Sequence, residues 1–179
     1  SSTDFVTNGV SSSFPVTVTG TPTPEVSLIS GSLPAGFSFV KTDGGAQLTF
    51  NGAGTNGTYH TTLQATNAGG RVVQNLSIVV GTQLQFTSPS TLNITAGIPV
   101  SFRVTTTGYP APVLTNKYPL PSGLTFKDNG NGTATISGTT YQQFPEQCID
   151  PSQCAIVATN ASGTVSRNFS VSIAHLPFD

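Results

Sequence analysis

The strongest constraint on the fold is that the chain repeats itself along its length. The stretch FPVTVTGTPTP at 14–24 matches FRVTTTGYPAP at 102–112, with Phe, Val, Gly and both prolines coinciding at an offset of 88 residues. Later segments match in the same order, and NLSIVV at 75–80 meets NFSVSI at 168–173, where the offset has grown to 93. The 179-residue chain therefore contains two copies of a unit of about 90 residues.

Within each copy, apolar residues alternate with Ser, Thr, Gln and Asn. Phe14 and Val16 alternate in this way in the first copy, and Phe102 and Val104 do so in the second. A period of two is typical of strands that are buried on one face, and turn sequences rich in Gly and Asn separate the runs. We therefore expect an all-β chain, with about seven short strands per copy packed as two antiparallel sheets.

The segment LPSGLTFKDNGNGTATISG at 120–138 predicts a β-hairpin. Leu124 and Phe126 lie on one strand, the Asn- and Gly-rich residues 129–132 form a tight turn, and Ala134 and Ile136 lie on the returning strand. The alternation also predicts buried side chains at inward positions shared by the two copies. These residues are Phe14, Phe39, Leu63, Phe102, Phe126 and Ile156.

These residues resemble the immunoglobulin-like repeats of bacterial secreted and surface proteins, which are distant relatives of cadherin-like domains. The resemblance rests on SFRVTTTGYPAPVL, LPSGLTFKDNGNGTATISGT and ATNASG followed by FSVSI, and it covers the second copy and most of the first. It implies two tandem immunoglobulin-like antiparallel β-sandwiches that serve as a spacer, stalk or adhesive module without catalytic residues. We expect them at 1–81 and 82–174, with 175–179 starting a following repeat or a linker.

The alignment further predicts that the first copy lacks an edge strand. At an offset of 88, Ser1 lies opposite Pro89, so residues 84–88 have no counterpart in the first copy. The neighbouring strand would then expose backbone donors and acceptors. The last residues, LPFD at 176–179, resemble the LQFT at 84–87 that opens the second copy. We therefore expect the chain to be an excerpt from a longer series of units.

The composition disfavours several kinds of partner. Charged residues make up only 7% of the chain, the net charge is −1, and no Lys/Arg cluster exists to neutralise phosphates, so nucleic acid is not an expected partner. No apolar run approaches the roughly 20 residues of a membrane span. The expected partners are neighbouring repeats in the same chain, with a host, cell-wall or glycan ligand as a further candidate. The expected location is secreted or at the cell surface.

We expect no metal, cofactor or catalytic residue. Asp43 and Asp128 lie beside Gly-rich turns, but after Asp128 the third position of a calcium loop is Gly130 and no Glu closes the loop. Asn67 and Asn160 stand where the calcium-binding relatives carry Asp. The sequence SFVK at 38–41 matches S-x-x-K formally, without the companion motifs of that enzyme class.

Cys148 and Cys154 flank an insertion that is peculiar to the second copy. With no His or third Cys nearby, a zinc site is not expected. An even cysteine count in an exported protein favours a local disulfide, with two free thiols as the alternative. A loop this short would contribute about 2 kcal/mol in the chain-entropy model. The first copy opens its penultimate strand with Tyr59, a candidate corner tyrosine, and the second copy has Ser152 at the aligned position.

Tyr109, Tyr118 and Tyr141 occur only in the second copy. The topology of such a sandwich places Tyr118 and Tyr141 at the end that holds the Cys148–Cys154 loop, and Tyr109 at the opposite end, facing the first copy. Two interpretations remain open: packing between neighbouring repeats, and a ligand patch, since exposed aromatic rings can stack on sugars.

The function that follows is that of non-catalytic structural or adhesive repeats in a secreted or cell-surface protein. The alternative is an accessory carbohydrate-binding module of a secreted hydrolase, which would use the tyrosines of the second copy.

Overall fold

The computed structural model describes residues 2–142 and 154–174. The chain forms two compact units, Ser1–Gln83 and Leu84–Asp179, so the division falls two residues after the boundary expected from the sequence. The described residues form strands, turns and loops, without a helix. No helix in this part of the chain could therefore span a membrane. Residues 175–179, which we expected to start another repeat or a linker, lie outside the described part.

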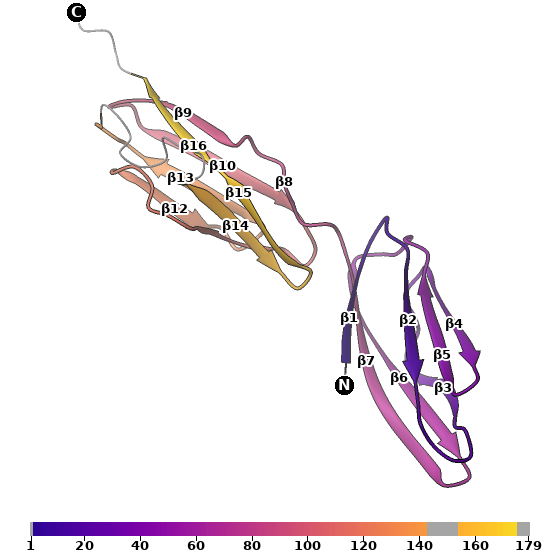
Figure 1. The fold of residues 1–179 in the computed structure, drawn as a ribbon. Coiled ribbons are helices and arrows are strands. Elements are labelled where there is room, and N and C mark those ends of the chain that lie inside the picture. The colour runs from indigo at the N-terminus through magenta and orange to yellow at the C-terminus, as the bar shows by residue number, and fades with distance from the viewer. Residues whose placement is uncertain (1, 143–153, 175–179) are drawn as a thin grey trace, which may run out of the picture. The chain divides into compact units, whose positions relative to one another are not determined.

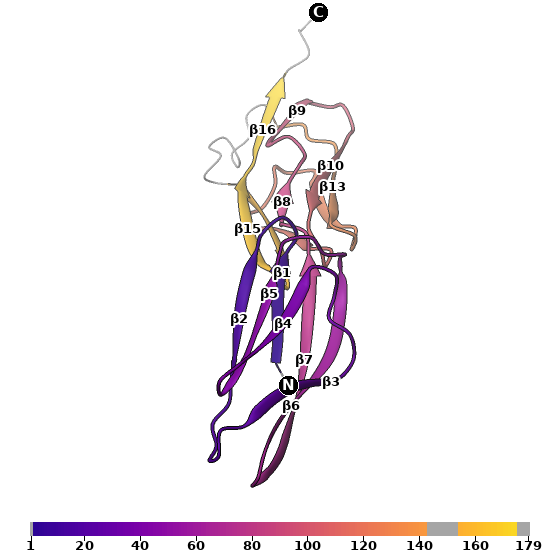
Figure 2. The same cartoon turned by 90° about the vertical axis from the view of Figure 1, so that its right-hand side faces the viewer.

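The first unit contains seven strands in two layers (Figure 1). One sheet has the order β1-β7-β6-β3 and the other the order β2-β5-β4. The strands are β1 (Ser2–Thr7), β2 (Ser12–Thr17), β3 (Glu25–Ser30), β4 (Phe37–Thr42), β5 (Gly45–Phe50), β6 (Gly57–Asn67) and β7 (Gly70–Gly81). Figure 2 shows the layer that contains β2, β5 and β4.

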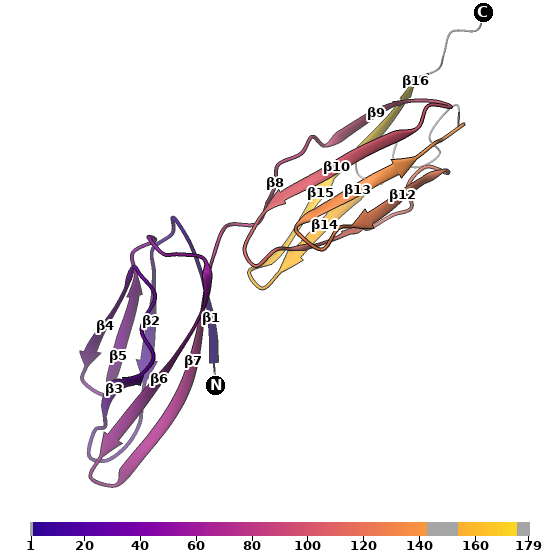
Figure 3. The same ribbon diagram turned by 180° about the vertical axis from the view of Figure 1, so that it is seen from behind.

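The described part of the second unit contains nine strands. One sheet has the order β12-β13-β10-β8, and the opposite layer consists of β11-β14-β15 and the pair β16-β9 (Figure 3). The strands are β8 (Gln85–Phe86), β9 (Thr91–Thr95), β10 (Val100–Thr107), β11 (Val113–Asn116), β12 (Leu124–Asp128), β13 (Thr133–Gly138), β14 (Ala155–Asn160), β15 (Gly163–Asn168) and β16 (Ser170–Ala174).

The predicted hairpin is present in the second unit. β12 and β13 pair antiparallel, with Phe126 opposite Ile136. Gly130 and Gly132 have φ values of 75° and 76°, which only glycine adopts without strain. The equivalent hairpin of the first unit pairs Phe39 with Leu48.

Each unit also contains one parallel pair, which the expectation of purely antiparallel sheets missed. β1 runs parallel to β7, and β9 runs parallel to β16. Parallel pairing needs a long crossover between the two strands. Here most of each unit forms the crossover: β1 and β7 are the first and last strands of the first unit, and β9 and β16 are the second and last described strands of the second unit.

Each unit has its own core between its two layers. In the first unit the core contains Leu48 and Phe50 of β5, Leu63 of β6 and Ile78 of β7. In the second unit the core draws on both layers in the same way, and its residues are Leu84, Leu92, Ile94, Val104, Leu114, Leu124, Ala134, Ile136, Cys154, Ile156, Ala158, Phe169 and Val171.

The predicted burial holds fully for only two of six residues. Leu63 and Ile156 are buried, at 4% and 3% exposed. The four phenylalanines are half-buried and pack against the cores. Three of them lie on outer strands, and the fourth, on β10, lies beyond the two residues that β8 covers. A ring on such a strand has a neighbouring strand on one side only. These residues are Phe14, Phe39, Phe126 and Phe102.

In the described residues, the sheet that contains β2 has three strands, and its counterpart in the second unit has four. In the second unit, β10 pairs with β13 on one side and with β8 on the other. In the described part of the first unit, β2 pairs with β5 alone. Among the described residues, the side of β2 away from β5 pairs with no strand, and the truncation expected from the sequence register stays a prediction.

Candidate functional site

Asn67 at the end of β6 and Asn160 at the end of β14 each hold a proline-containing loop of their own unit by hydrogen bonds. Asn67 Nδ2 donates to the carbonyl oxygen of Pro22 at 2.7 Å, and its Oδ1 accepts from the amide of Gly69 at 2.9 Å. Asn160 makes the same pair of bonds, to Pro110 at 2.7 Å and from Ser162 at 2.9 Å. Both prolines follow a cis peptide bond. A carboxylate has no donor for the proline carbonyl, so these positions need an amide.

Asp43 lies in the turn between β4 and β5, and Asp128 is the last residue of β12. Asp128 Oδ1 accepts from the amide of Gly130 at 3.2 Å, which closes the turn locally. The described residues contain no cluster of three or more His, Cys, Asp or Glu side chains that could hold a metal ion.

Tyr118 and Tyr141 lie at one end of the second unit. β13 ends at Gly138, opposite Val100 at the start of β10, and Tyr141 follows it. β11 ends at Asn116, and the amide of Lys117 donates to the carbonyl of Ala155 at 2.8 Å. Cys154, next to Ala155, belongs to the same end of the unit.

The two rings differ in their surroundings. Tyr118 is 39% exposed, with the Lys117 ammonium 5.4 Å from its ring centroid. Tyr141 is 79% exposed and lies near Gly97, close enough that a Cβ placed there would be 3.7 Å from its ring. Tyr109 follows β10 at the opposite end of the unit and is half-buried. Two of the sequence-predicted tyrosines, Tyr118 and Tyr141, are thus exposed at one end of the second unit, and Tyr109 lies at the other end.

Cys154 is buried, at 3% exposed, within the core of the second unit. Its carbonyl oxygen accepts from the amide of Phe169 at 2.9 Å. Cys148 lies outside the described residues, so the pairing of the two cysteines remains a prediction.

Tyr59 acts as the corner tyrosine of the first unit. Its hydroxyl donates to the carbonyl of Thr55, four residues upstream, at 3.0 Å, and its ring packs against the core. Ser152, its counterpart by alignment, lies outside the described residues.

The S-x-x-K residues do not form a reactive pair. Ser38 bonds to Thr49 across the sheet, and the Lys41 ammonium donates to Glu25. The hydrogen bond from Lys41, together with its charge, lowers the pKa of the Glu25 carboxyl. Both partners are exposed, at 53% for Lys41 and 71% for Glu25, so the ion pair adds little to stability.

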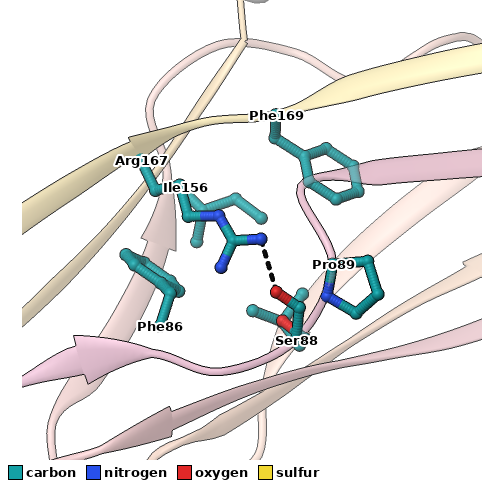
Figure 4. Close-up of a pocket in the computed structure, with 7 residues that line it drawn as sticks. Phe86, Ser88, Pro89, Ile156, Arg167 and Phe169 are labelled. Atoms are coloured by element: carbon teal, nitrogen blue, oxygen red, sulfur yellow. Dashed lines mark hydrogen bonds between the residues drawn. The ribbon is translucent and has the colours of Figure 1, made fainter.

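Arg167 and β8 form a packed side of the second unit that sequence reasoning missed (Figure 4). The Arg167 guanidinium lies 5.5 Å from the Phe86 ring centroid and donates to the carbonyl of Ser88. Phe86, Ile156 and Phe169 line one small space beside Arg167, and this space is too small for a water molecule. The sequence signal for this contact was a single Arg, which lies between Ser166 and Asn168 in the sequence.

The corresponding side of the first unit is hollow. A groove of about 360 Å³ lies between β2 and β7, and we call it the edge groove. Its apolar lining consists of Phe14, Val16, Leu48, Leu63 and Leu76. Two further hollows, of about 240 and 570 Å³, share lining residues with it and extend it along β7 past Val72.

No protein-family model matches the sequence, and no curated protein sequence matches it. The structure is similar to extracellular domains 3–5 of Drosophila OTK, with a TM-score of 0.59 and 19% identity over 97% of this chain and 59% of that one. It is also similar to an I-band fragment of titin, with a TM-score of 0.52 and 16% identity over 96% of this chain and 62% of that one.

A pair of tandem Ig domains of titin covers 98% of this chain and 94% of its own, at a TM-score of 0.45 and 17% identity. At identities this low the likeness to OTK and to the I-band fragment bears on the fold alone. The fold is that of two tandem immunoglobulin-like β-sandwiches, as the sequence predicted.

Proposed function

We propose that the two units are non-catalytic structural or adhesive repeats of a secreted or cell-surface protein, akin to the bacterial repeats that the sequence resembles. The observation that carries the proposal is the repetition of internal packing without repetition of reactive groups. Asn67 and Asn160 both serve to hold a proline loop, and Ser38 and Lys41 bond to other partners. Side chains that recur in both units recur because both folds need them.

The short connection between the units supports a spacer role. Only Thr82 and Gln83 separate Gly81, the last residue of β7, from Leu84, which is 6% exposed in the core of the second unit. Each residue spans at most about 3.5 Å, so the covalent connection itself is short. The proposal includes an extracellular location. Charged residues make up only 7% of the chain, and Ser and Thr are abundant, which suits such a location.

A single-molecule pulling experiment tests this function. Stretching the chain by its ends should give two separate unfolding steps, each releasing about 3.5 Å per residue of one unit. A reduced sample serves as a control, because the pairing of Cys148 and Cys154 would shorten the second step. A gradual extension without discrete steps would contradict a load-bearing role.

The second candidate is carbohydrate binding by the second unit. The observation in its favour is the exposure of Tyr118 and Tyr141 at one end of that unit, since exposed rings can stack on sugars. Saturable binding on a glycan array, lost in the double variant Tyr118→Ala/Tyr141→Ala and kept in Tyr109→Ala, would favour the module. If no glycan gives a specific signal, the carbohydrate-binding candidate is rejected and only the structural role remains.

A further inference from the structure

A row of two cations and a hydroxyl crosses one sheet of the second unit. The strands β12, β13 and β10 lie side by side (Figure 3), and Thr135 of β13 pairs with Lys127 on one side and Arg103 on the other. Their neighbours Val104 and Ala134 belong to the core, and side chains alternate between the two faces of a strand. The row therefore lies on the outer face of the sheet, where Arg103 and Lys127 are exposed.

Hydroxyl and amide side chains surround the two cations on this face. The Arg103 guanidinium donates to Thr133 Oγ1 at 3.4 Å. Asn129 Nδ2 donates to the hydroxyls of Thr133 and Thr135 at 3.0 and 3.1 Å. The remaining strand positions on the same face are occupied by Ser101, Thr105, Thr125 and Ser137.

Within the described part of the chain, no carboxylate forms an ion pair with Arg103 or Lys127. Asp128 follows Lys127 in β12, but it pairs with Ala134 of the core, so the alternation of the strand places it on the opposite face. Its Oδ1 accepts from the amide of Gly130. The face therefore carries two positive charges that no acidic side chain of the described residues balances, and such a surface attracts anions.

The matched row of the first unit carries no charge. There Gln47 of β5 pairs with Val40 on one side and with Pro15 on the other. The repeat offset of 88 aligns Pro15 with Arg103. Because the same sheet forms in the first unit without cations in this row, the fold does not require Arg103 and Lys127. Their presence in the second unit favours a role for this surface in binding.

We propose that this outer face binds an acidic polysaccharide, and we call it the cationic face, defined by Arg103, Lys127 and the hydroxyl residues between and beside them. Neighbouring strands lie about 4.8 Å apart, so the backbone positions of the two cations are about 10 Å apart across the sheet. An extended polymer can contact both at once. The cations bind its carboxylate or sulfate groups, and the Ser and Thr hydroxyls bond to sugar hydroxyls.

Other anionic partners fit the cationic face less well. Nucleic acids gain their affinity from many phosphate contacts, and single strands also need aromatic rings on which bases stack. The described residues of the face include no aromatic or large apolar side chain. They therefore lack the anchors that protein partners and membrane surfaces bury.

An NMR titration of the full chain at low ionic strength tests the proposal, with polygalacturonate, heparin and neutral dextran as the added polymers. At least one of the two acidic polymers should shift the backbone amide signals of Arg103, Lys127 and Thr135, and dextran should shift none of them. Val40 and Gln47 of the first unit are internal controls and should not shift. If neither acidic polymer shifts the three signals, or dextran shifts them equally, the proposal is wrong.

Variants that remove charge locate the contact. Arg103→Gln and Lys127→Gln should each weaken binding by about two- to fivefold, as for an exposed ion pair, and the double variant should lose more than either. Arg103→Lys keeps the charge and should bind almost as the parent does. Lys117→Gln is the matched control, because it removes an equal, exposed charge from the same unit beside Tyr118. Unchanged binding by the double variant, or an equal loss in Lys117→Gln, would overturn the assignment.

Two further measurements separate this proposal from its neighbours. Added salt should weaken binding more steeply for the parent chain than for the double variant, since fewer counterions are released without the two cations. A single-stranded oligonucleotide should bind more weakly than the acidic polysaccharides, and tighter binding would reject the polysaccharide as partner. The proposal gives the adhesive role a ligand class and rests on that role. Failure of the pulling experiment would contradict only the mechanical role, so the two failures are distinguishable.

Discussion

Asn160 donates its side-chain amide to the backbone carbonyl of Pro110, with 2.7 Å between Nδ2 and the oxygen. Asn67 and Pro22 repeat the bond in the first unit at the same length. The Oδ1 atoms of both Asn side chains accept backbone amides. Each Asn side chain therefore holds its loop by donating one hydrogen bond and accepting another. An ionised Asp could only accept, which gives a physical reason for finding no Asp at these positions.

Replacing Asn67 or Asn160 by Asp should destabilise the unit that contains it. Asn160→Asp loses the donor to a half-buried carbonyl, and Asn67→Asp loses the same bond in a more exposed place. We expect losses of about 1–3 kcal/mol, larger for Asn160, because an unpaired buried acceptor costs more. Chemical denaturation, monitored with NMR signals from each unit separately, measures the loss of stability in both variants.

Asn75→Asp is the matched control for these two variants. Asn75 uses only its Oδ1, which accepts from the Thr62 hydroxyl at 3.2 Å, and a carboxylate can accept as well. This variant should therefore be nearly neutral. Equal losses for Asn75 and Asn160 would show that added charge, rather than the lost donor, causes the effect.

Gly123→Ala should unfold or strongly destabilise the second unit. Gly123 has a φ of 89°, and an added Cβ would lie 2.1 Å from the backbone oxygen of Thr139. Relieving such a contact requires backbone movement, and we expect a loss above about 3 kcal/mol. Gly130 has a similar φ of 75° with nothing within 4 Å of an added Cβ, so Gly130→Ala isolates the cost of the φ angle, about 1–2 kcal/mol. Thermal denaturation of the two variants gives the difference, and equal melting temperatures would rule out the contact.

Cys148 and Cys154 should be joined in the oxidised protein. Alkylation of the native, unreduced chain followed by mass spectrometry should label neither thiol. Reduction should cost about 2 kcal/mol, confined to the second unit, because the loop is short. Two labelled thiols after unfolding without reductant would disprove the pairing, and loss of the first unit on reduction would disprove a local role.

The pH dependence of the first unit should include a small contribution from Glu25. Lys41 lowers the pKa of this carboxyl from its ordinary value of 4.5, first through a hydrogen bond and then through its charge. A lowered pKa in the folded state means that the stabilisation is present above pH 4.5 and is lost as the pH falls through the folded pKa. NMR titration of the Glu25 carboxyl should show its pKa return to the ordinary value in Lys41→Gln. Lys127→Gln, in the second unit, should leave it unchanged, and an unmoved pKa in Lys41→Gln would show that the ion pair does not persist in solution.

The sequence by itself determined the number of units, their all-β class and the hairpin at 120–138. Each of these depends on local periodicity, turn residues or register, which neighbouring residues along the chain specify. The alignment of Asn67 with Asn160 was also visible in the sequence, although their proline partners were not.

Only the tertiary structure decided what each repeated residue contacts. Asn160 reaches Pro110 across 50 residues of sequence, and Arg167 meets Ser88 across 79. The parallel pairing of β1 with β7 joins opposite ends of the first unit in the same way. The half-burial of Phe14 and the open groove beside it depend on which strand lies next to β2. Such contacts arise from how the layers close around one core, and no periodicity along the chain encodes them.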